Sequence, residues 1–318
     1  MINSTAIIVT YNSEAAVGAA VRSAKWAGLK VVVVDNASTD ASTEVARAAG
    51  ADEIIVNVEN LGFAGGVNRG FAALGEEAQC VVLLNPDAEI TTPVDALLES
   101  CWVHGGACGM LQDVEGKSQT GFQLRRFPRP LTLALEVLGI NRAWPGNPVN
   151  RSYRYFDLDF GRSQIVEQPA AAFLVVRRDV WVALGGFDVQ FHPVWFEDVD
   201  FCKRLKTKGF SIEYVPAAVA RHVGGHSVGK LPYTKRLTTW YASLLKYGQK
   251  HFSSAGLRVT AAAVLLGAVP RCVLGICEER NVRPIAVWVT ICNLCIRILF
   301  LGQGRFKEDE RVHINRGF

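Results

Sequence analysis

The chain has 318 residues, of which 49% are hydrophobic and 20% are charged, a balance that excludes a disordered or fibrous protein. Its 34 Lys and Arg residues against 30 Asp and Glu leave a formal net charge of +4, too weak a bias to indicate a nucleic-acid partner. The length suits two domains or one enlarged α/β domain.

The first third of the sequence alternates apolar runs with helical stretches. Strands are predicted over residues 6–10, 31–34, 53–56 and 80–84, and helices over 13–27, 39–49 and 67–74. The continuous β-branched runs indicate a parallel sheet that is covered on both faces. Ligands of such sheets bind at the carboxyl ends of the strands. The polar residues fall at these ends: Thr10, Tyr11, Asn12, Asp35, Asn36, Asn85 and Asp87.

The middle of the chain is less regular. Proline-containing loops are expected at 127–130 and 144–148, after which an apolar run at 170–176 resumes the sheet. Two further helices and one further strand are predicted over 179–184, 199–208 and 212–215, respectively.

The last sixty residues change character. Residues 259–269 and 285–301 are mainly apolar, but neither gives a clean run of the ~20 apolar residues that span a bilayer. Arginines accompany both stretches: Arg271, Arg280, Arg283, Arg297 and Arg305. This combination favours helices that lie at the anionic face of a membrane, while a helical cap on the core or an oligomer interface is the alternative.

The eight cysteines are scattered along the chain, unlike the dense framework of a small secreted domain. Cys292 and Cys295 form a CxxC in an apolar stretch with no second pair nearby, so buried helix thiols are favoured over a zinc or redox site. No basic region precedes the first apolar run, and we therefore expect no signal peptide and a cytoplasmic location.

Two glycine motifs point away from common enzyme classes. The glycine-rich string at 60–70 misses the GxGxxG spacing, which disfavours a dinucleotide oxidoreductase. It still permits close backbone approach to a ligand, and a tight strand-to-helix turn with Asn68 inside the helix is equally compatible. The GxSxG match at 225–229 lacks the strand and helix that a nucleophile elbow needs, so a serine hydrolase is not expected.

An acidic cluster, Glu-Asp-Val-Asp at 197–200, follows an aromatic run and leads into a predicted helix. Such carboxylates can simply cap the helix. Two adjacent carboxylates beside aromatic side chains also suit a general base, because partial desolvation raises the proton affinity of one of them. Asp87 is well placed to bind a metal that bridges a diphosphate, and His222 or His226 can add an imidazole ligand.

In their order along the chain, these motifs resemble the inverting glycosyltransferases of family 2, which have the GT-A fold. The resemblance covers about residues 5 to 230, and within the family the chain looks most similar to bacterial rhamnosyltransferases, in particular the actinobacterial ones that add L-rhamnose to N-acetylglucosaminyl-diphospho-decaprenol. The matching strings are IVTYN at 8–12, VVDNASTD at 33–40, the string at 60–70, LLNPD at 83–87, GGFD at 185–188, WFEDVD at 195–200 and HVGGHS at 222–227.

The resemblance implies an α/β nucleotide-diphospho-sugar transferase fold, with a mostly parallel central sheet flanked by helices and a helical extension at the C-terminus. The glycosyltransferase domain would span 1–230, with a nucleotide-binding half at 1–110 and an acceptor and catalytic half at 111–230. Residues 231–318 would form a helical region that associates with the membrane.

The resemblance also implies a role for each candidate site residue. Asp198 would be the catalytic base with Glu197 beside it, and Asp87 the principal ligand of a divalent metal, Mg²⁺ or Mn²⁺, with His222 completing the site. The DxD motif reads Asn85-Pro86-Asp87, so its first carboxylate is an amide. Donor-binding residues would be Thr10, Tyr11, Asn12, Asp35, Asn36, Asn60, Gly65, Asn68 and Asn85.

The implied reaction moves a sugar from a nucleotide-diphospho-sugar to a polyprenyl-diphosphate-linked N-acetylglucosamine at the cytoplasmic face of the membrane. L-rhamnose from dTDP-L-rhamnose is the first candidate, and UDP-galactose or UDP-N-acetylglucosamine are alternative donors. A non-catalytic protein that binds sugar nucleotides or lipids would also be compatible with Asn85. A nucleotidyltransferase would need a glycine-rich basic loop near the N-terminus, which residues 10–14 do not supply. An oligomer is compatible with the sequence.

Overall fold

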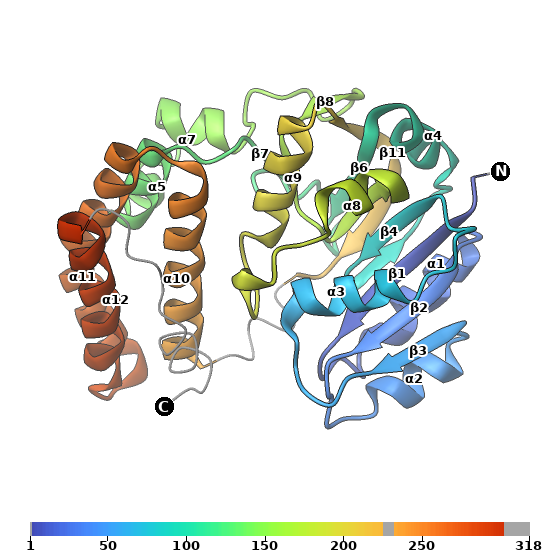
Figure 1. The fold of residues 1–318 in the computed structure, drawn as a ribbon, viewed down its shortest axis with the longest axis horizontal. Coiled ribbons are helices and arrows are strands. Elements are labelled where there is room, and N and C mark those ends of the chain that lie inside the picture. Colours follow the sequence, from blue (N-terminus) through green and yellow to red (C-terminus); the bar gives the residue numbers. More distant parts are fainter. Residues whose placement is uncertain (1, 225–231, 302–318) are drawn as a thin grey trace. The chain divides into compact units, whose positions relative to one another are not determined.

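The computed structural model describes residues 2–224 and 232–301, and these form two compact units (Figure 1). Unit 1 comprises Met1–Phe127, Arg154–Pro193 and Glu197–Gly229, and unit 2 comprises Pro128–Tyr153, Val194–Phe196 and Lys230–Phe318.

Unit 1 contains every strand of the described chain, together with helices on both sides of the sheet. Its strands are β1 (Ser4–Thr10), β2 (Lys30–Asp35), β3 (Glu53–Val56), β4 (Cys80–Leu84), β5 (Ala88–Ile90), β6 (Gly105–Gln112), β7 (Leu124–Arg125), β8 (Gln164–Val166), β9 (Gln168–Pro169), β10 (Phe173–Arg177) and β11 (Ser211–His222). Its helices are α1 (Val17–Trp26), α2 (Ser42–Ala48), α3 (Gly62–Ala72), α4 (Asp95–His104), α8 (Arg178–Leu184), the 3₁₀ turn η1 (Val189–Phe191) and α9 (Glu197–Thr207).

The main sheet has the strand order β3-β2-β1-β4-β10-β6-β11-β5, and β8 pairs with β11. The first four strands are parallel, as the sequence predicts, and the Val- and Ile-rich runs of β1, β2 and β4 are buried, whereas β3 at the edge of the sheet is only partly covered. Beyond β4 the sheet is mixed, since β10 runs antiparallel to both β4 and β6. The predicted α/β class, with a central sheet flanked by helices, is confirmed.

The helices cover the sheet as right-handed crossovers require. From β1, the chain adds β2 and then β3 towards one edge of the sheet, with α1 and α2 as the connections. It then returns through α3 to add β4 on the other side of β1, so α3 lies on the opposite face from α1 and α2 (Figure 1). On the α1 face, Ala20, Val21 and Ala24 pack with Val31 and Val33 of β2 in the main core.

Several element boundaries differ from the prediction. Helix α3 begins at Gly62 rather than 67, so the glycine-rich string forms the first turns of a helix instead of a loop. Strand β6 was not predicted, because its sequence Gly-Gly-Ala-Cys-Gly contains the residue most depleted in strands. Gly109 is nevertheless required there, since a Cβ atom would overlap the Phe173 ring on the neighbouring strand β10.

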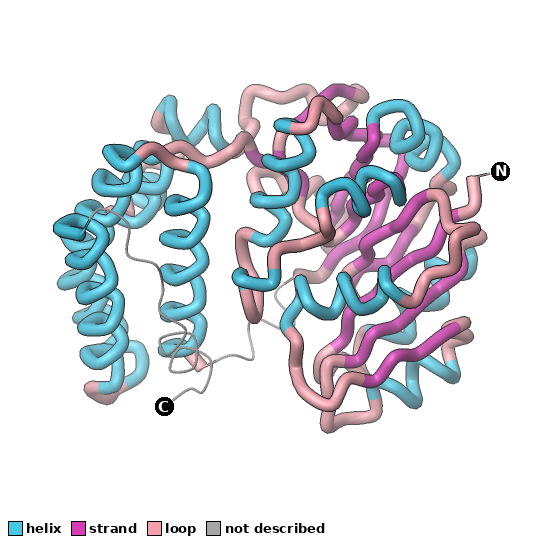
Figure 2. The backbone as a smooth tube through the Cα atoms, in the orientation of Figure 1, coloured by secondary structure: helices cyan, strands magenta, loops and turns pink. Residues whose placement is uncertain are grey.

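Unit 2 contains only helices in its described part (Figure 2). They are α5 (Pro130–Val137), α6 (Ile140–Ala143), α7 (Pro148–Tyr153), α10 (Tyr233–His251), α11 (Ser254–Glu279) and α12 (Arg283–Leu301). Helix α11 continues through Pro270, which makes it longer than the apolar segment that ends at 269 in the sequence.

Both C-terminal apolar segments form helices that are longer than the segments themselves. Ser254–Glu279 and Arg283–Phe300 both have the length and hydropathy to cross a membrane, a test that the core helix of a soluble protein also passes. Only 39% and 28% of their most apolar windows is buried, so both helices expose apolar side chains. Those on α11 and α12 include Leu266, Val269, Val273, Leu274, Val289 and Phe300.

In unit 1, α3 is fixed to the loop after α8 by one amide side chain. Asn68 Nδ2 donates to the Phe187 carbonyl at 2.8 Å, and the Phe187 N–H donates to Asn68 Oδ1 at 2.9 Å. The two preceding glycines both have positive φ, +70° at Gly185 and +72° at Gly186. A Cβ atom at Gly186 would lie 2.5 Å from Asn68 Oδ1, whereas one at Gly185 meets nothing within 4 Å.

These two glycines form a matched pair for measuring the Asn68 contact. Gly185→Ala should cost only the left-handed backbone penalty of ~1–2 kcal/mol. Gly186→Ala should cost a further ~1–3 kcal/mol because the methyl group displaces the Asn68 amide. Urea unfolding of both variants measures the difference. Equal free energies of unfolding would show that the hydrogen bonds between Asn68 and Phe187 do not stabilise this loop.

Candidate functional site

The carboxyl ends of β1 and β2 present two buried oxygen atoms side by side. Thr10 and Asp35 are register partners in the parallel pair, and both are buried. Asp35 Oδ2 accepts from the Ser38 N–H at 2.9 Å, but Asp35 Oδ1 and Thr10 Oγ1 have no hydrogen-bond partner among the described residues. Because unpaired buried oxygens are costly, this end of the sheet is suited to bind a polar ligand.

Two amides near this end of the sheet hold loops rather than facing an open site. Asn12 Oδ1 accepts from the Thr39 N–H at 2.8 Å. The buried Asn36 donates through Nδ2 to the Gly62 carbonyl at 2.9 Å and accepts from Asn57 at 2.9 Å. A carboxylate at position 36 could not donate that bond, which accounts for an amide there. Tyr11, by contrast, is 38% exposed beside Thr10.

The remaining donor-site candidates lie at the start of α3 and within it. Asn60 Oδ1 accepts from the Gly62 N–H at 2.8 Å, and Gly65 and Asn68 lie inside the helix. The Asn68 amide is bonded at both ends to Phe187, so the structure gives it a positioning role between α3 and the α8 loop.

A second group of side chains gathers where β4 ends and β11 ends. His222 Nε2 lies 3.4 Å from Asp87 Oδ1 and 3.4 Å from Asn85 Nδ2, and His222 and Asp87 are both shielded from solvent. The register of the antiparallel pair β11–β5, in which His222 faces Ala88, places these residues together. The structure thus brings together the two predicted metal ligands and the amide that replaces the first carboxylate of the DxD motif.

Gln119 fixes the tautomer of His222, a role that the sequence did not reveal. Gln119 Nε2 donates to the His222 carbonyl at 2.6 Å, which leaves Gln119 Oε1 to accept from His222 Nδ1 at 3.0 Å. With Nδ1 donating to Gln119, Nε2 is the ring nitrogen that faces Asp87 and Asn85. Phe122 stacks on the ring at 5.5 Å. No spacing motif links Gln119 to His222, because the two meet only through folding.

The third group is the acidic pair that opens α9. Asp198 Oδ1 accepts from the Val199 N–H at 2.8 Å, and Asp198 Oδ2 accepts from the Ala171 N–H at 3.4 Å. The next residue, Ala172, accepts from the Asn85 N–H at 3.0 Å. Two consecutive residues, Ala171 and Ala172, therefore link the Asp198 carboxylate to the backbone of Asn85 at the end of β4.

Glu197 and Asp198 sit in different surroundings. Glu197 is buried, and Glu197 Oε2 has no hydrogen-bond partner among the described residues. Burial, and then the charge of Asp198, raises the pKa of Glu197 well above its ordinary value. Burial also raises the pKa of Asp198, although its two backbone hydrogen bonds and the nearby Arg125 oppose this shift. Glu197 is thus suited to hold a proton and Asp198 to exchange one.

The last carboxylate of the cluster has a structural role. Asp200 is buried, and it accepts from Arg204 Nε at 2.8 Å. Arg204 also donates to the carbonyls of Leu184 and Gly186, which fixes α9 to the loop after α8. Immediately before α9, Trp195 (φ 79°) and Phe196 (φ 72°) are both left-handed, a strained backbone that is commonest at functional sites.

His226 and the GxSxG match at 225–229 lie outside the described residues. Cys292 and Cys295 are free thiols on α12. No group of three or more His, Cys, Asp or Glu side chains within 2–224 and 232–301 could hold a metal ion by itself, so any ion bound by Asp87 and His222 needs further ligands from elsewhere.

The raised pKa of Glu197 predicts a pH-dependent stability. A folded-state pKa above the unfolded value favours the folded state below the unfolded pKa and loses that advantage as pH rises. Glu197→Gln should therefore match the native chain in acid and become more stable than it as pH rises from 5 to 8. Thermal unfolding across this range measures the effect, with exposed Glu99→Gln as control. A pH-independent difference would contradict the assignment.

Comparison with known proteins places this geometry in a family. The family model described as Glycosyl transferase family 2 matches residues 5–102. The N-acetylglucosaminyl-diphospho-decaprenol L-rhamnosyltransferase of Mycobacterium tuberculosis is 30% identical over 218 residues, which cover 64% of this chain and 69% of the relative. The rhamnosyltransferase WbbL of Escherichia coli is 28% identical over 152 residues, which cover 46% of this chain and 53% of WbbL.

Among solved structures, GalNAc-T7 with UDP, GalNAc and Mn²⁺ superposes with a TM-score of 0.52 at 13% identity, covering 79% of this chain and 50% of that chain. At this identity the likeness concerns the fold alone, and the predicted GT-A architecture is confirmed. The relationship to the mycobacterial enzyme favours an enzyme over a non-catalytic binding protein. The chain belongs to glycosyltransferase family 2 and is a glycosyltransferase.

Proposed function

We propose that this glycosyltransferase moves L-rhamnose from dTDP-L-rhamnose to the N-acetylglucosamine of a polyprenyl-diphosphate-linked acceptor, with inversion at the anomeric carbon. The names of the mycobacterial relative and of WbbL support the sugar, and the former supports the acceptor. The observation that carries the reaction is the link through Ala171 and Ala172, which holds the Asp198 carboxylate beside the end of β4.

The nucleoside of the donor would bind at the ends of β1 and β2. The unpartnered Asp35 Oδ1 can accept a hydrogen bond from the imide N–H of a thymine or uracil, and Thr10 Oγ1 can bond a base or sugar oxygen. Tyr11 offers a half-exposed ring beside them. Five further residues would support this site indirectly, because they hold its loops and α3 in place: Asn12, Asn36, Asn60, Gly65 and Asn68.

The residues around His222 fit a divalent ion that also binds the donor diphosphate. A carboxylate oxygen on Asp87 and a neutral imidazole nitrogen on His222 are suitable ligands for Mn²⁺ or Mg²⁺. Diphosphate oxygens would complete the coordination, and Gln119 would orient the imidazole as second-sphere partners do. When bound, the ion neutralises charge on the leaving diphosphate.

The Asp198 carboxylate would act as the general base. It takes the proton from the acceptor hydroxyl while that oxygen attacks the anomeric carbon from the face opposite the diphosphate. The bond to the diphosphate breaks as the new glycosidic bond forms, which inverts the configuration. A raised pKa makes Asp198 a stronger base than an ordinary aspartate, and it moves the acidic limb of the rate profile to higher pH.

Replacing this base should separate chemistry from binding. Asp198→Asn should lower kcat at least ~10²-fold while donor affinity stays within a few-fold, because the amide keeps the shape but cannot take a proton. Steady-state transfer assays and ligand-detected NMR measure the two quantities. Asp95→Asn, an exposed carboxylate on α4, is the control. Near-normal turnover in Asp198→Asn would overturn the assignment.

A donor screen tests the sugar nucleotide and the metal together. We expect dTDP-L-rhamnose to bind in preference to UDP-N-acetylglucosamine, UDP-galactose and GDP-mannose, and Mn²⁺ to strengthen that binding. Asp87→Ala should remove most of the Mn²⁺ effect, which electron paramagnetic resonance of bound Mn²⁺ reports without any turnover. Preference for another donor would contradict the proposal that the sugar is L-rhamnose. Unchanged Mn²⁺ affinity in Asp87→Ala would contradict the proposal that Asp87 is a metal ligand.

We also propose that unit 2 associates peripherally with the cytoplasmic face of the membrane. The exposed apolar side chains of α11 and α12, such as Leu266 and Phe300, support this proposal, as does a lipid-linked acceptor. The full chain should float with anionic vesicles and be released by alkaline carbonate. Leu266→Glu with Phe300→Glu should weaken flotation, whereas Val114→Glu, on an exposed loop of unit 1, should not. Retention after carbonate would contradict peripheral binding.

A further inference from the structure

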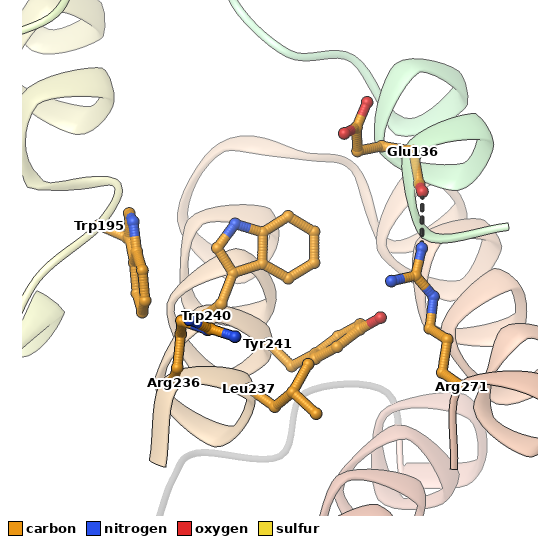
Figure 3. Close-up of a pocket in the computed structure, with 7 residues that line it drawn as sticks. All are labelled: Glu136, Trp195, Arg236, Leu237, Trp240, Tyr241 and Arg271. Carbon is orange, nitrogen blue, oxygen red and sulfur yellow. Dashed lines mark hydrogen bonds between the residues drawn. The ribbon is translucent and has the colours of Figure 1, made fainter. Parts of the chain in front are cut away.

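Unit 2 contains a cavity of about 370 Å³ that the proposed chemistry of unit 1 does not use. Its walls combine the guanidinium groups of Arg236 and Arg271 with the rings of Trp195, Trp240 and Tyr241 (Figure 3). Cationic groups beside large apolar rings suit a ligand that is anionic at one end and apolar at the other.

A buried hydroxyl points into this cavity. Tyr241 is 1% exposed, and its Oη has no hydrogen-bond partner among the described residues. Figure 3 shows this hydroxyl on the side of the cavity where Arg271 lies. A buried O–H donor without an acceptor is costly, and its orientation towards a cationic wall points to an anionic acceptor on a ligand.

The two arginines are held differently. Arg271 donates from Nε to the Val137 carbonyl at 2.9 Å and from Nη2 to the Glu136 carbonyl at 3.0 Å, which fixes its guanidinium at the end of α5. These bonds leave Nη1 as a donor for a ligand. Arg236 is half-buried and stacks 5.8 Å from the Tyr233 ring, and no carboxylate of the described residues forms an ion pair with it.

One acidic side chain opposes an anion in this cavity. Glu136 also lines it, but Glu136 Oε2 accepts from Asn141 Nδ2 at 2.8 Å. Two guanidinium groups against one carboxylate leave the wall with a net positive charge. The negative charge of Glu136 should weaken the binding of an anion. Removing that charge should therefore strengthen the binding.

We propose that this cavity binds the diphosphate of the polyprenyl-linked acceptor, with Arg236, Arg271 and Tyr241 on the phosphate oxygens and Trp195 and Trp240 against the first isoprene units. The identity of the acceptor rests on the proposed function. Guanidinium groups match phosphate geometry with paired hydrogen bonds, and indole rings provide an apolar surface for the chain.

The surroundings of the cavity agree with a lipid ligand. Arg271 lies on α11, and the same helix exposes Leu266, Val269 and Val273. One arginine of the proposed anion site and part of the apolar surface proposed to face the membrane therefore lie on the same helix, α11. Along the chain, Trp195 precedes Glu197 by two residues.

Farnesyl diphosphate, with farnesol and inorganic diphosphate as partial ligands, tests the proposal on the full chain in detergent by titration calorimetry. We expect farnesyl diphosphate to bind more tightly than either partial ligand. Arg236→Gln and Tyr241→Phe should each weaken its binding about tenfold or more, on the scale of one lost charge-assisted hydrogen bond. Glu136→Gln should tighten it. Binding of farnesol should not change in any of these variants.

Exposed Arg258→Gln on α11 controls for loss of one positive charge and should bind as the native chain does. Tyr241→Phe separates a binding role from a structural one, because removing an unpaired buried hydroxyl should not destabilise the fold. Native affinity in both Arg236→Gln and Tyr241→Phe would overturn the site while leaving the proposed acceptor intact. Absence of farnesyl diphosphate binding to the native chain would also overturn the site, whereas normal donor binding without transfer to a polyprenyl-diphosphate-linked N-acetylglucosamine would overturn the acceptor.

Discussion

The pairing of β4 with β10 is the constraint on which the site depends. It sets Ala172 against Asn85, and the preceding residue, Ala171, then meets the Asp198 carboxylate. The end of a strand from the first third of the chain and the start of a helix from the last part of unit 1 are thereby fixed together. Without this antiparallel pair, nothing would fix the proposed base, Asp198, to the strand end that precedes Asn85 and Asp87.

Burial divides the polar residues of unit 1 into two kinds. Asn36, Asn68, Asp200 and Gln119 have their hydrogen bonds satisfied by the backbone or by other side chains, and they hold loops and helices in place. Thr10, Asp35 and Glu197 keep buried oxygens without partners among the described residues. Unpaired buried oxygens are costly, and these three residues are among those that we propose for binding or catalysis.

Unit 2 follows a different principle. Its helices α11 and α12 expose many large apolar side chains. Inside it, Arg271 both caps the carbonyls at the end of α5 and lines the cavity, so one side chain links packing to a possible ligand site. The helices of the described part of unit 2, with exposed apolar side chains and a cationic cavity wall, fit the proposed lipid that carries a diphosphate.

The sequence by itself determined the parallel half of the sheet, because hydrophobic runs such as Lys30–Asp35 are local and must be buried on both faces. It also identified the family through motifs of adjacent residues, and it placed Thr10 and Asp35 at one edge. Only the tertiary structure decided what those residues contact. The glycine-rich string became a helix start because Gly62 and Gly66 meet Pro193 and Val9, which are remote in sequence. Gln119, Ala171 and the cavity of unit 2 left no local signal, since hydrogen bonds and cavity walls between distant segments form only when the chain folds.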